Sequence, residues 1–316
     1  MNNLIVMGEC MLELSTTPTG QTNKSFGGDV YNTAVYYKRL MQQQGNVGFF
    51  TAVGEDNISQ QMVAQFQLEQ LNTEYVFTNS DKTIGAYMIE TSAQGERSFT
   101  FWRNDSAARF MMADSHQLLK AMDDDSIDTF YFSGISLAIL YPQHRTAFWQ
   151  LLTELKQRGA KIAFDTNYRP KLWLTAEDAL EQFKLAFAHS DIVFTGVEDM
   201  SPLIKSDDAN QLAQYCAQFD IAELIVKNEA KQVICLTPEQ RYLVDVIPAS
   251  NVVDSTAAGD SFNGAYLAAR AKGYSISNSA AFACEIAKSV LFHRGAIMAQ
   301  DSFNSCEQVQ AFRQQS

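Results

Sequence analysis

DSTAAGDSFNGA, residues 254–265, is the stretch of this 316-residue sequence that says most about the fold and its chemistry. It places a run of small residues, 255–259, before Asp260 and the amphipathic segment SFNGAYLAARAKG, and after the apolar strand YLVDVIP at 242–248. This order predicts a strand, a tight loop and the first turn of a helix. Helix N-termini carry unpartnered N–H groups and positive dipole potential, so a phosphate can bind there without any cationic side chain.

Asp260 would lie beside such a phosphate, where its carboxylate can orient an attacking hydroxyl and accept its proton. The same spacing fits a simpler structure, in which Asp260 caps the helix and the small residues permit close packing. The stretch taken alone leaves these two interpretations equally open.

Six short apolar runs alternate with amphipathic stretches along the chain. The runs predict strands and lie at 4–9, 47–54, 127–135, 161–167, 191–196 and 222–228. The stretches have apolar residues three and four apart, which predicts helices at 31–44, 59–71, 144–159, 176–190 and 210–219. The alternation predicts an α/β fold of three layers, with a mainly parallel central sheet that binds ligands at the carboxyl ends of its strands.

One region, 83–103, alternates like a hairpin with SAQGE at 92–96 as its turn. Together with MLELS at 11–15 it predicts a small separate β-sheet, which we interpret as a lid formed by insertions around 9–26 and 83–104. The sequence has no repeat and no flexible linker, so residues 1–316 are expected to form a single domain. The exposed edge of the lid sheet would let two copies pair as a homodimer.

The composition excludes several classes of protein. The net charge is −12 with both signs mixed along the chain, so no nucleic-acid partner is expected, and an anionic ligand needs locally placed Arg or Lys. The N-terminus lacks the basic region of a signal peptide, and no apolar run reaches the roughly 20 residues of a membrane span. The five cysteines are scattered and the four histidines isolated, which favours a reducing cytoplasm and argues against a disulfide framework or a His-based or thiolate metal site.

Residues 254–265 resemble the C-terminal signature of the ribokinase-like carbohydrate kinases, commonly D-T-x-G-A-G-D-x-F, with Ser255 for the Thr and Ala257 for the first Gly. The segment FGGDVYNTAVYYKRL at 26–40 resembles the other signature of that family, and the resemblance covers nearly the whole chain. The segments at 8–15, 95–104, 132–140 and 164–173 are similar to the branch of the family whose acceptor is the sugar acid 2-keto-3-deoxygluconate.

The resemblance implies transfer of the ATP γ-phosphate to the 6-hydroxyl of that sugar acid, with Mg²⁺ neutralising phosphate charge. It implies Asp260 as catalytic base and a backbone anion hole at 257–260, formed by Ala257, Ala258, Gly259 and Asp260. The sugar acid would contact Gly28, Asp29, Asn32, Tyr87, Phe101, Arg103, Arg169 and Asp260. The nucleotide would contact Asn167, Lys227, Ser255, Ala257 and Gly259, and the metal Glu198 and Asp199.

Arg103 and Arg169 end the segments SFTFWR and NYR, and a guanidinium can bind a carboxylate through two charge-assisted hydrogen bonds. Without the resemblance, surface ion pairs would be the simpler interpretation of both. The sequence departs from the family where Phe101 replaces a frequent tyrosine, where no glycine follows Lys227, and where Gly196 replaces an asparagine.

Four other functions are considered. A related kinase for a neutral sugar or nucleoside would need no partner for a carboxylate. A nicotinamide-dependent dehydrogenase or a P-loop enzyme is disfavoured, because no G-x-G-x-x-G follows the first strand and no Walker motif occurs. A non-catalytic sugar-acid sensor could share the fold, but the Gly259–Asp260 pair argues for catalysis.

Overall fold

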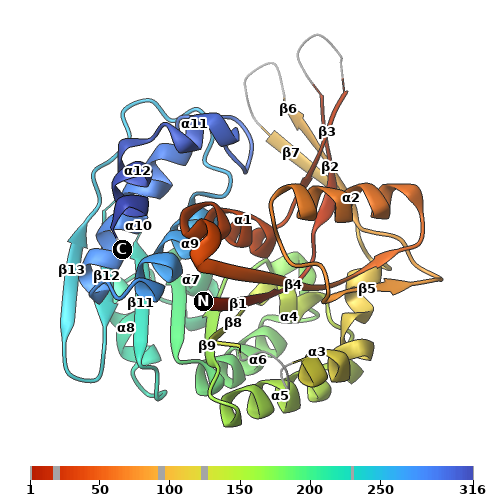
Figure 1. Ribbon diagram of the computed structural model, residues 1–316. Coiled ribbons are helices and arrows are strands. Elements are labelled where there is room, and N and C mark those ends of the chain that lie inside the picture. Colours follow the sequence, from red (N-terminus) through yellow and green to blue (C-terminus); the bar gives the residue numbers. More distant parts are fainter. Residues whose placement is uncertain (1, 17–21, 92–96, 122–126, 229–230, 316) are drawn as a thin grey trace.

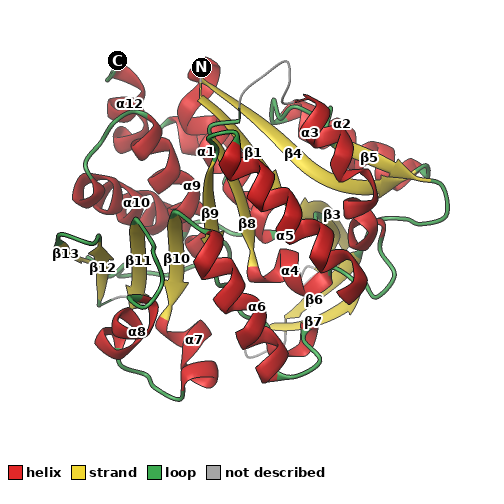
Figure 2. Ribbon diagram, turned by 90° about the horizontal axis from the view of Figure 1, so that it is seen from below, coloured by secondary structure: helices red, strands yellow, loops and turns green. Residues whose placement is uncertain are grey.

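The structure, a computed structural model, describes residues 2–16, 22–91, 97–121, 127–228 and 231–315. Its centre is a nine-stranded sheet in the order β13-β12-β11-β10-β9-β8-β1-β4-β5 (Figures 1 and 2). Strands β11 through β5 run parallel, and β12 and β13 are antiparallel additions at one edge. The strands span β1 Asn2–Met7, β4 Gly45–Gly54, β5 Val76–Asn79, β8 Thr129–Ser133, β9 Lys161–Asp165, β10 Ile192–Gly196, β11 Glu223–Asn228, β12 Gln232–Leu236 and β13 Arg241–Asp245.

The six predicted strands are confirmed as β1, β4, β8, β9, β10 and β11. Their apolar runs are continuous because both faces of the sheet are covered. Along β1, Leu4 and Val6 belong to one hydrophobic core, and Ile5 and Met7 belong to the other.

Helices cover the two faces, which confirms the three layers (Figure 2). One core contains residues of α3 Ser115–Ala121, α4 Gly134–Ile139, α5 Pro142–Gln157, α6 Ala176–His189, α7 Val197–Ile204, α8 Ala209–Cys216 and the 3₁₀ helix Ala107–Asp114. The other contains residues of α1 Asp29–Met41, α2 Asn57–Leu68, α9 Ala258–Ala271, α10 Ile276–Val290, α11 Gln300–Asn304 and α12 Glu307–Gln314. Two short 3₁₀ helices, Gln42–Gln44 and Pro170–Leu172, complete the set.

A second sheet of four strands projects from the body of the molecule (Figure 1). Its order is β3-β2-β6-β7, with β2 Met11–Thr16, β3 Thr22–Gly27, β6 Ala86–Thr91 and β7 Arg97–Trp102. The predicted small sheet is therefore confirmed, and the predicted turn at 92–96 lies outside the described residues. β2 and β6 are parallel, so the sheet is mixed.

The chain reaches α9 differently from the sequence prediction. β13 ends at Asp245 and α9 begins at Ala258, so residues 254–257 do not follow a strand directly. β13 is the outermost strand of the large sheet, and the chain has to return from that edge before α9 can pack beside α1.

Two general properties bear on the class of protein. Within the described residues, no helix combines the length and apolar character that a membrane crossing requires. All five cysteines are free thiols.

The parallel strands bring several polar residues to one edge of the large sheet. β9 ends at Asp165, β10 at Gly196, and Lys227 is the penultimate residue of β11. The small sheet starts at this same edge, because β2 follows β1 after Gly8–Cys10. The carboxyl edge of the large sheet and the base of the small sheet therefore adjoin, as expected for a ligand site.

Candidate active site

The loop before α9 is held by one buried carboxylate. Asp254 accepts hydrogen bonds from the Thr256 N–H and hydroxyl at 3.0 and 2.7 Å, and from the Gly295 N–H at 2.8 Å. Ala257 then precedes α9 in the left-handed region, with φ 61° and ψ 14°, where glycine is the usual residue. This strained turn sets the direction in which α9 starts.

The first turn of α9 contains backbone N–H groups that are free to bind a ligand. Within the described residues, the N–H groups of Gly259 and Asp260 have no hydrogen-bond acceptor. Such groups, at the positive end of the helix dipole, can bind an anion. Of the anion hole predicted at 257–260, the geometry leaves Gly259 and Asp260 as possible donors, whereas the Ala258 N–H donates to the Ser255 carbonyl oxygen at 3.4 Å.

Asp260 does not cap the helix. Ala257 occupies the N-cap position and no side chain makes a capping hydrogen bond, so the capping interpretation is excluded. The Asp260 carboxylate instead accepts a hydrogen bond from Asn32 Nδ2 at 2.8 Å, and its carbonyl oxygen accepts one from the Thr33 hydroxyl at 3.2 Å. These contacts tie the start of α9 to the first turns of α1.

The backbones of the two helices come close together at Gly264. A Cβ atom added at Gly264 would lie 2.6 Å from the Thr33 carbonyl oxygen. Glycine at this position thus permits the approach that brings Asn32 to Asp260.

The pKa of Asp260 is raised above its ordinary value, first by withdrawal of the carboxylate from water and then by the neighbouring charge of Asp29. The hydrogen bond from Asn32 and the ammonium of Lys227 act in the opposite direction and lower the pKa. A carboxylate with a raised pKa is a stronger proton acceptor. The environment of Asp260 therefore suits a general base.

The start of α1 brings further predicted residues together. Gly28 is its N-cap, and a Cβ there would lie 2.3 Å from the Glu9 carbonyl oxygen. Asn167 donates from Nδ2 to Asp29 Oδ2 at 2.7 Å. Like Ala257, Asn167 has a positive φ, of 28°. Asn32 Oδ1 is buried and has no hydrogen-bond partner among the described residues, which leaves an unsatisfied acceptor next to Asp260.

Lys227 lies beside the anion hole. Its Nζ donates to Asp165 Oδ1 at 3.1 Å and to Asn263 Oδ1 at 3.4 Å, and a Cβ at Gly259 would lie 3.7 Å from it. Asn263 Nδ2 in turn donates to the Tyr131 hydroxyl at 2.9 Å. Asp165 and Asn263 were missed in the sequence. Asp165 could have been found because it ends the apolar strand segment in FDTN. Asn263 could have been found because it lies one helical turn after Gly259.

Arg169 and Asp199 form a second charged pair at the same edge. Arg169 Nη1 donates to Asp199 Oδ1 at 3.3 Å, and the Thr166 hydroxyl donates to Oδ2 at 3.3 Å. Burial, followed by the charge of Asp165, raises the pKa of Asp199 to about 6. Arg169 Nη1 also donates to the Tyr168 carbonyl oxygen at 2.9 Å, and the Arg169 side chain is 54% exposed.

Two predicted residues stand apart from this group. Glu198 and Ser255 are exposed, and within the described residues neither side chain hydrogen-bonds another predicted site residue. The described residues contain no group of three or more His, Cys, Asp or Glu side chains placed to hold a metal ion.

The small sheet contributes Tyr87 and Phe101 from paired positions on β6 and β7. Their rings stack with centroids 5.7 Å apart, and the Phe101 side chain is half exposed. The Tyr87 hydroxyl donates to Glu13 Oε2, and the Ser25 hydroxyl donates to Glu13 Oε1 at 2.9 Å. Glu13 is a residue that the sequence did not single out.

Arg103 follows β7 and is buried in an ion pair with Glu9. The Ser106 hydroxyl also donates to Glu9. The sequence indicated Arg103 but not its counter-ion, which follows β1.

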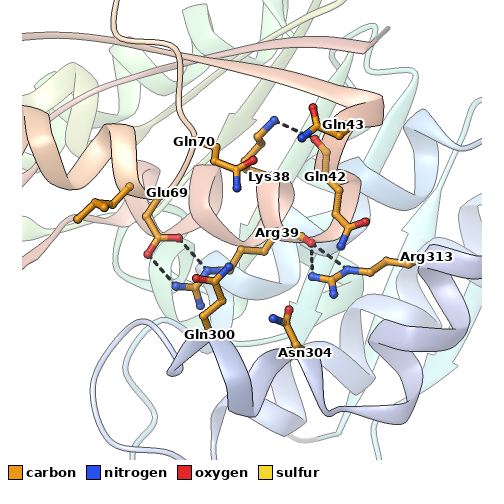
Figure 3. Close-up of a pocket in the computed structure, with 10 residues that line it drawn as sticks. Lys38, Arg39, Gln42, Gln43, Glu69, Gln70, Gln300, Asn304 and Arg313 are labelled. Carbon is orange, nitrogen blue, oxygen red and sulfur yellow. Dashed lines mark hydrogen bonds and ion pairs between the residues drawn. The ribbon is translucent and has the colours of Figure 1, made fainter.

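A cavity of about 300 Å³ lies elsewhere, between the ends of α1 and α2 and the C-terminal helices (Figure 3). At this cavity Arg39 forms an ion pair with Glu69, and Arg313 donates to the Arg39 carbonyl oxygen. None of the predicted site residues lines it.

A helix start with free backbone N–H groups beside a carboxylate, at the carboxyl edge of a parallel sheet, is an arrangement by which an α/β protein can hold a phosphorylated ligand. The chain belongs to the pfkB family of carbohydrate kinases, whose model matches residues 1–302. It is 36% identical over 302 residues to a 2-dehydro-3-deoxygluconokinase of Dickeya dadantii, covering 94% of this chain and 96% of the relative.

Two further comparisons extend the likeness. A fructokinase of Vibrio alginolyticus is 28% identical over 268 residues, covering 85% of this chain and 84% of that relative. The crystal structure of a fructokinase with bound ATP from Xylella fastidiosa superimposes with a TM-score of 0.83 at 22% identity, covering 99% and 98% of the two chains. These comparisons confirm the ribokinase-like fold.

Proposed function

We propose that this protein transfers the γ-phosphate of ATP to the 6-hydroxyl of 2-keto-3-deoxygluconate, also called 2-dehydro-3-deoxygluconate. The observation that carries the proposal is the Asp260 carboxylate, held by Asn32 at 2.8 Å beside the Gly259 and Asp260 amides, which have no acceptor among the described residues. Membership of a carbohydrate kinase family and similarity to a relative with that activity support the same assignment.

In the proposed reaction the 6-hydroxyl oxygen attacks the γ-phosphorus, Asp260 accepts the hydroxyl proton, and ADP leaves. The amides of residues 257–260 would stabilise the charge on the transferred group. Lys227, hydrogen-bonded to Asp165 and close to Gly259, would hold the phosphate chain, and Asn167 would lie next to it. Ser255 is proposed to contact the nucleotide from its exposed position in the loop.

Mg²⁺ would neutralise charge on the β- and γ-phosphates during transfer. This ion keeps several waters and uses one or two protein carboxylates, so it does not need a cage of protein ligands. Asp199 fits this requirement, because burial and the charge of Asp165 raise its pKa to about 6 and a cation would stabilise its ionised form. Glu198, its neighbour in the first turn of α7, is exposed and is the second candidate.

The sugar-acid substrate is supported by the two arginines. Arg169 has exposed donors and a single ion pair, so it would bind the substrate carboxylate. Arg103, Tyr87 and Phe101 would contact the sugar from the small sheet, and Gly28, Asp29 and Asn32 would bind its hydroxyls. The alternative is a neutral sugar, as for the Vibrio fructokinase, and it is favoured by the pairing of Arg103 with Glu9, which cancels one of the two positive charges.

A substrate panel tests the proposal. We expect wild-type protein, assayed for ADP release, to show a higher kcat/KM for 2-keto-3-deoxygluconate than for fructose, ribose or adenosine. Arg169→Ala should lower kcat/KM for the sugar acid about ten- to a hundredfold, the value of a hydrogen bond between charged groups, and affect the neutral sugars less. Lys120→Ala, an exposed cation on α3, is the control. Equal losses on acid and neutral sugars would show that Arg169 does not recognise the carboxylate.

We also propose that residues 1–316 act as one domain in which the small sheet is a lid over the sugar. The exposed β7 aromatics Phe99, Phe101 and Trp102 support pairing of two lids in a homodimer. The free cysteines agree with the proposed cytoplasmic location.

A further inference from the structure

The short segment that leads from β1 into β2, residues 9–13, carries two carboxylates to which the proposed function assigns no role. Glu9 follows β1 and Glu13 lies in β2. Each binds a side chain of the β6–β7 hairpin that is proposed to contact the sugar: Glu9 pairs with Arg103, and Glu13 accepts the Tyr87 hydroxyl hydrogen bond. One segment therefore supports both polar contacts that the hairpin offers to the substrate.

Glu13 is placed to hold Tyr87 rather than to react. Both of its carboxylate oxygens accept hydrogen bonds from the protein, one from Tyr87 and one from Ser25 at 2.9 Å. The Tyr87 hydroxyl is also enclosed, because a Cβ at Gly27 would lie 2.6 Å from it. A buried hydroxyl that lost this acceptor would be unpaired, and its ring would no longer be fixed at one rotation.

Glu9 fixes Arg103 in the same way. The Arg103 side chain is 6% exposed and that of Glu9 is 1% exposed, so the charge of Arg103 is compensated before any ligand binds. Glu9 is itself held by the Ser106 hydroxyl. Arg169, 54% exposed, keeps donors for a substrate carboxylate. In the proposed function, Arg169 would therefore bind the carboxylate of the sugar acid, and Arg103 would position its carbon chain.

We propose that Glu9 and Glu13 are positioning residues for sugar recognition, which fix the Arg103 guanidinium and the Tyr87 hydroxyl before the substrate binds. This inference rests on the proposed function, because it needs Arg103 and Tyr87 to contact the sugar. A fixed guanidinium and a fixed hydroxyl oxygen, which can still accept a hydrogen bond, bind a ligand more tightly than mobile groups, since less side-chain freedom is lost on binding.

The test is a double-mutant cycle on Glu13 and Tyr87, with KM for 2-keto-3-deoxygluconate, KM for ATP and kcat measured for each protein. We expect Glu13→Ala to raise the sugar KM by up to about tenfold, because the released Tyr87 hydroxyl would lose one hydrogen bond to the sugar, and to leave the ATP KM within about twofold of the wild type. Tyr87→Phe should do the same. The double variant should be no worse than either single variant, because Glu13 acts through the Tyr87 hydroxyl. Glu13→Gln, whose amide oxygen can accept the same hydrogen bond, should recover part of the loss.

Glu90→Ala provides the matched control, since Glu90 is an exposed carboxylate on the same hairpin. Glu9→Gln should likewise raise the sugar KM and spare the ATP KM; if this variant does not fold, the Glu13 cycle alone decides. Additive losses in the double variant, or a Glu13→Ala protein that matches Glu90→Ala, would overturn the inference while the proposed function stands. A wild-type protein that phosphorylates no sugar of the panel would remove the proposed function and the inference together.

Discussion

The surroundings of Asp260 favour its proposed function as a base and lower the stability of the folded protein. Its carboxylate lies close to Asp29 and partly withdrawn from water, both of which raise its pKa. A single hydrogen bond from Asn32 and the nearby Lys227 ammonium keep it in place. The same surroundings that make Asp260 a better base destabilise its ionised form in the folded protein.

Asp260→Asn should lower kcat about 10²- to 10⁴-fold, the usual contribution of a general base. The amide keeps the shape of the side chain and leaves the backbone amides of the anion hole unchanged, so ATP affinity should stay within about twofold. A coupled assay and calorimetric titration with ATP measure the two effects. Near-normal turnover of this variant would show that another group accepts the proton.

The same variant should be more stable than the wild type at neutral pH. Because the pKa of Asp260 is higher in the folded chain than its ordinary value of 3.8, the folded protein binds more protons above pH 3.8. The wild type therefore loses stability as pH rises from 3.8 through the raised pKa, and the variant, which lacks this group, does not. We expect a gain on the order of 1 kcal/mol at pH 7 that disappears toward pH 4.

Urea unfolding at several pH values measures this difference, with Asp207→Asn as an exposed control. A gain that stayed constant across the pH range would show that it does not come from the titration of Asp260.

At the scale of elements, the pair α1 and α9 forms the site. Asn32 and Thr33 near the start of α1 bind Asp260 near the start of α9, and Gly264 lets the helices approach. The distance between the two helices therefore controls where the Asp260 carboxylate lies.

Gly264→Ala tests that control. Its Cβ would lie 2.6 Å from the Thr33 carbonyl oxygen, so the helices have to separate. Overpacking of this kind costs about 1–3 kcal/mol of the free energy of unfolding, and the shift should also lower kcat by weakening the bond between Asn32 and Asp260. Thermal unfolding and kinetics measure both, with Asn278→Ala on the exposed side of α10 as control. A stable, fully active Gly264→Ala protein would contradict this role.

The same elements show what the sequence could predict. β1 and β4 were predictable because strands buried on both faces are continuously apolar. β3, with the polar sequence TNKSFG, was not, because its pairing with β2 through the backbone leaves no side-chain pattern. The predicted site residues came from the resemblance to the kinase family. The contacts of Lys227 with Asp165 and of Arg103 with Glu9 join segments far apart in the chain, so the spacing of residues in the sequence could not predict them.

At the scale of the whole molecule, the two sheets carry residues with different proposed functions. The large sheet and α9 carry Asp165, Lys227 and Asp260, which would act on phosphate, and the small sheet carries Tyr87, which would contact the sugar. The edge strands of the small sheet are β3 and β7, and β7 carries the exposed aromatics. Its exposed edge and aromatics need either a ligand or another chain to cover them.

Pairing through β7 gives the last prediction. The wild-type protein should sediment at micromolar concentration with twice the 35.3 kDa mass of one chain. Thr100→Lys places a charge on the exposed edge strand, where lysine opposes strand pairing, and should yield a monomer. Gln157→Lys on the exposed side of α5 adds the same charge away from the sheet and should leave the dimer intact. If Thr100→Lys still sedimented as a dimer, the two chains would associate through another surface, and the lid would be free to close on the sugar within each chain.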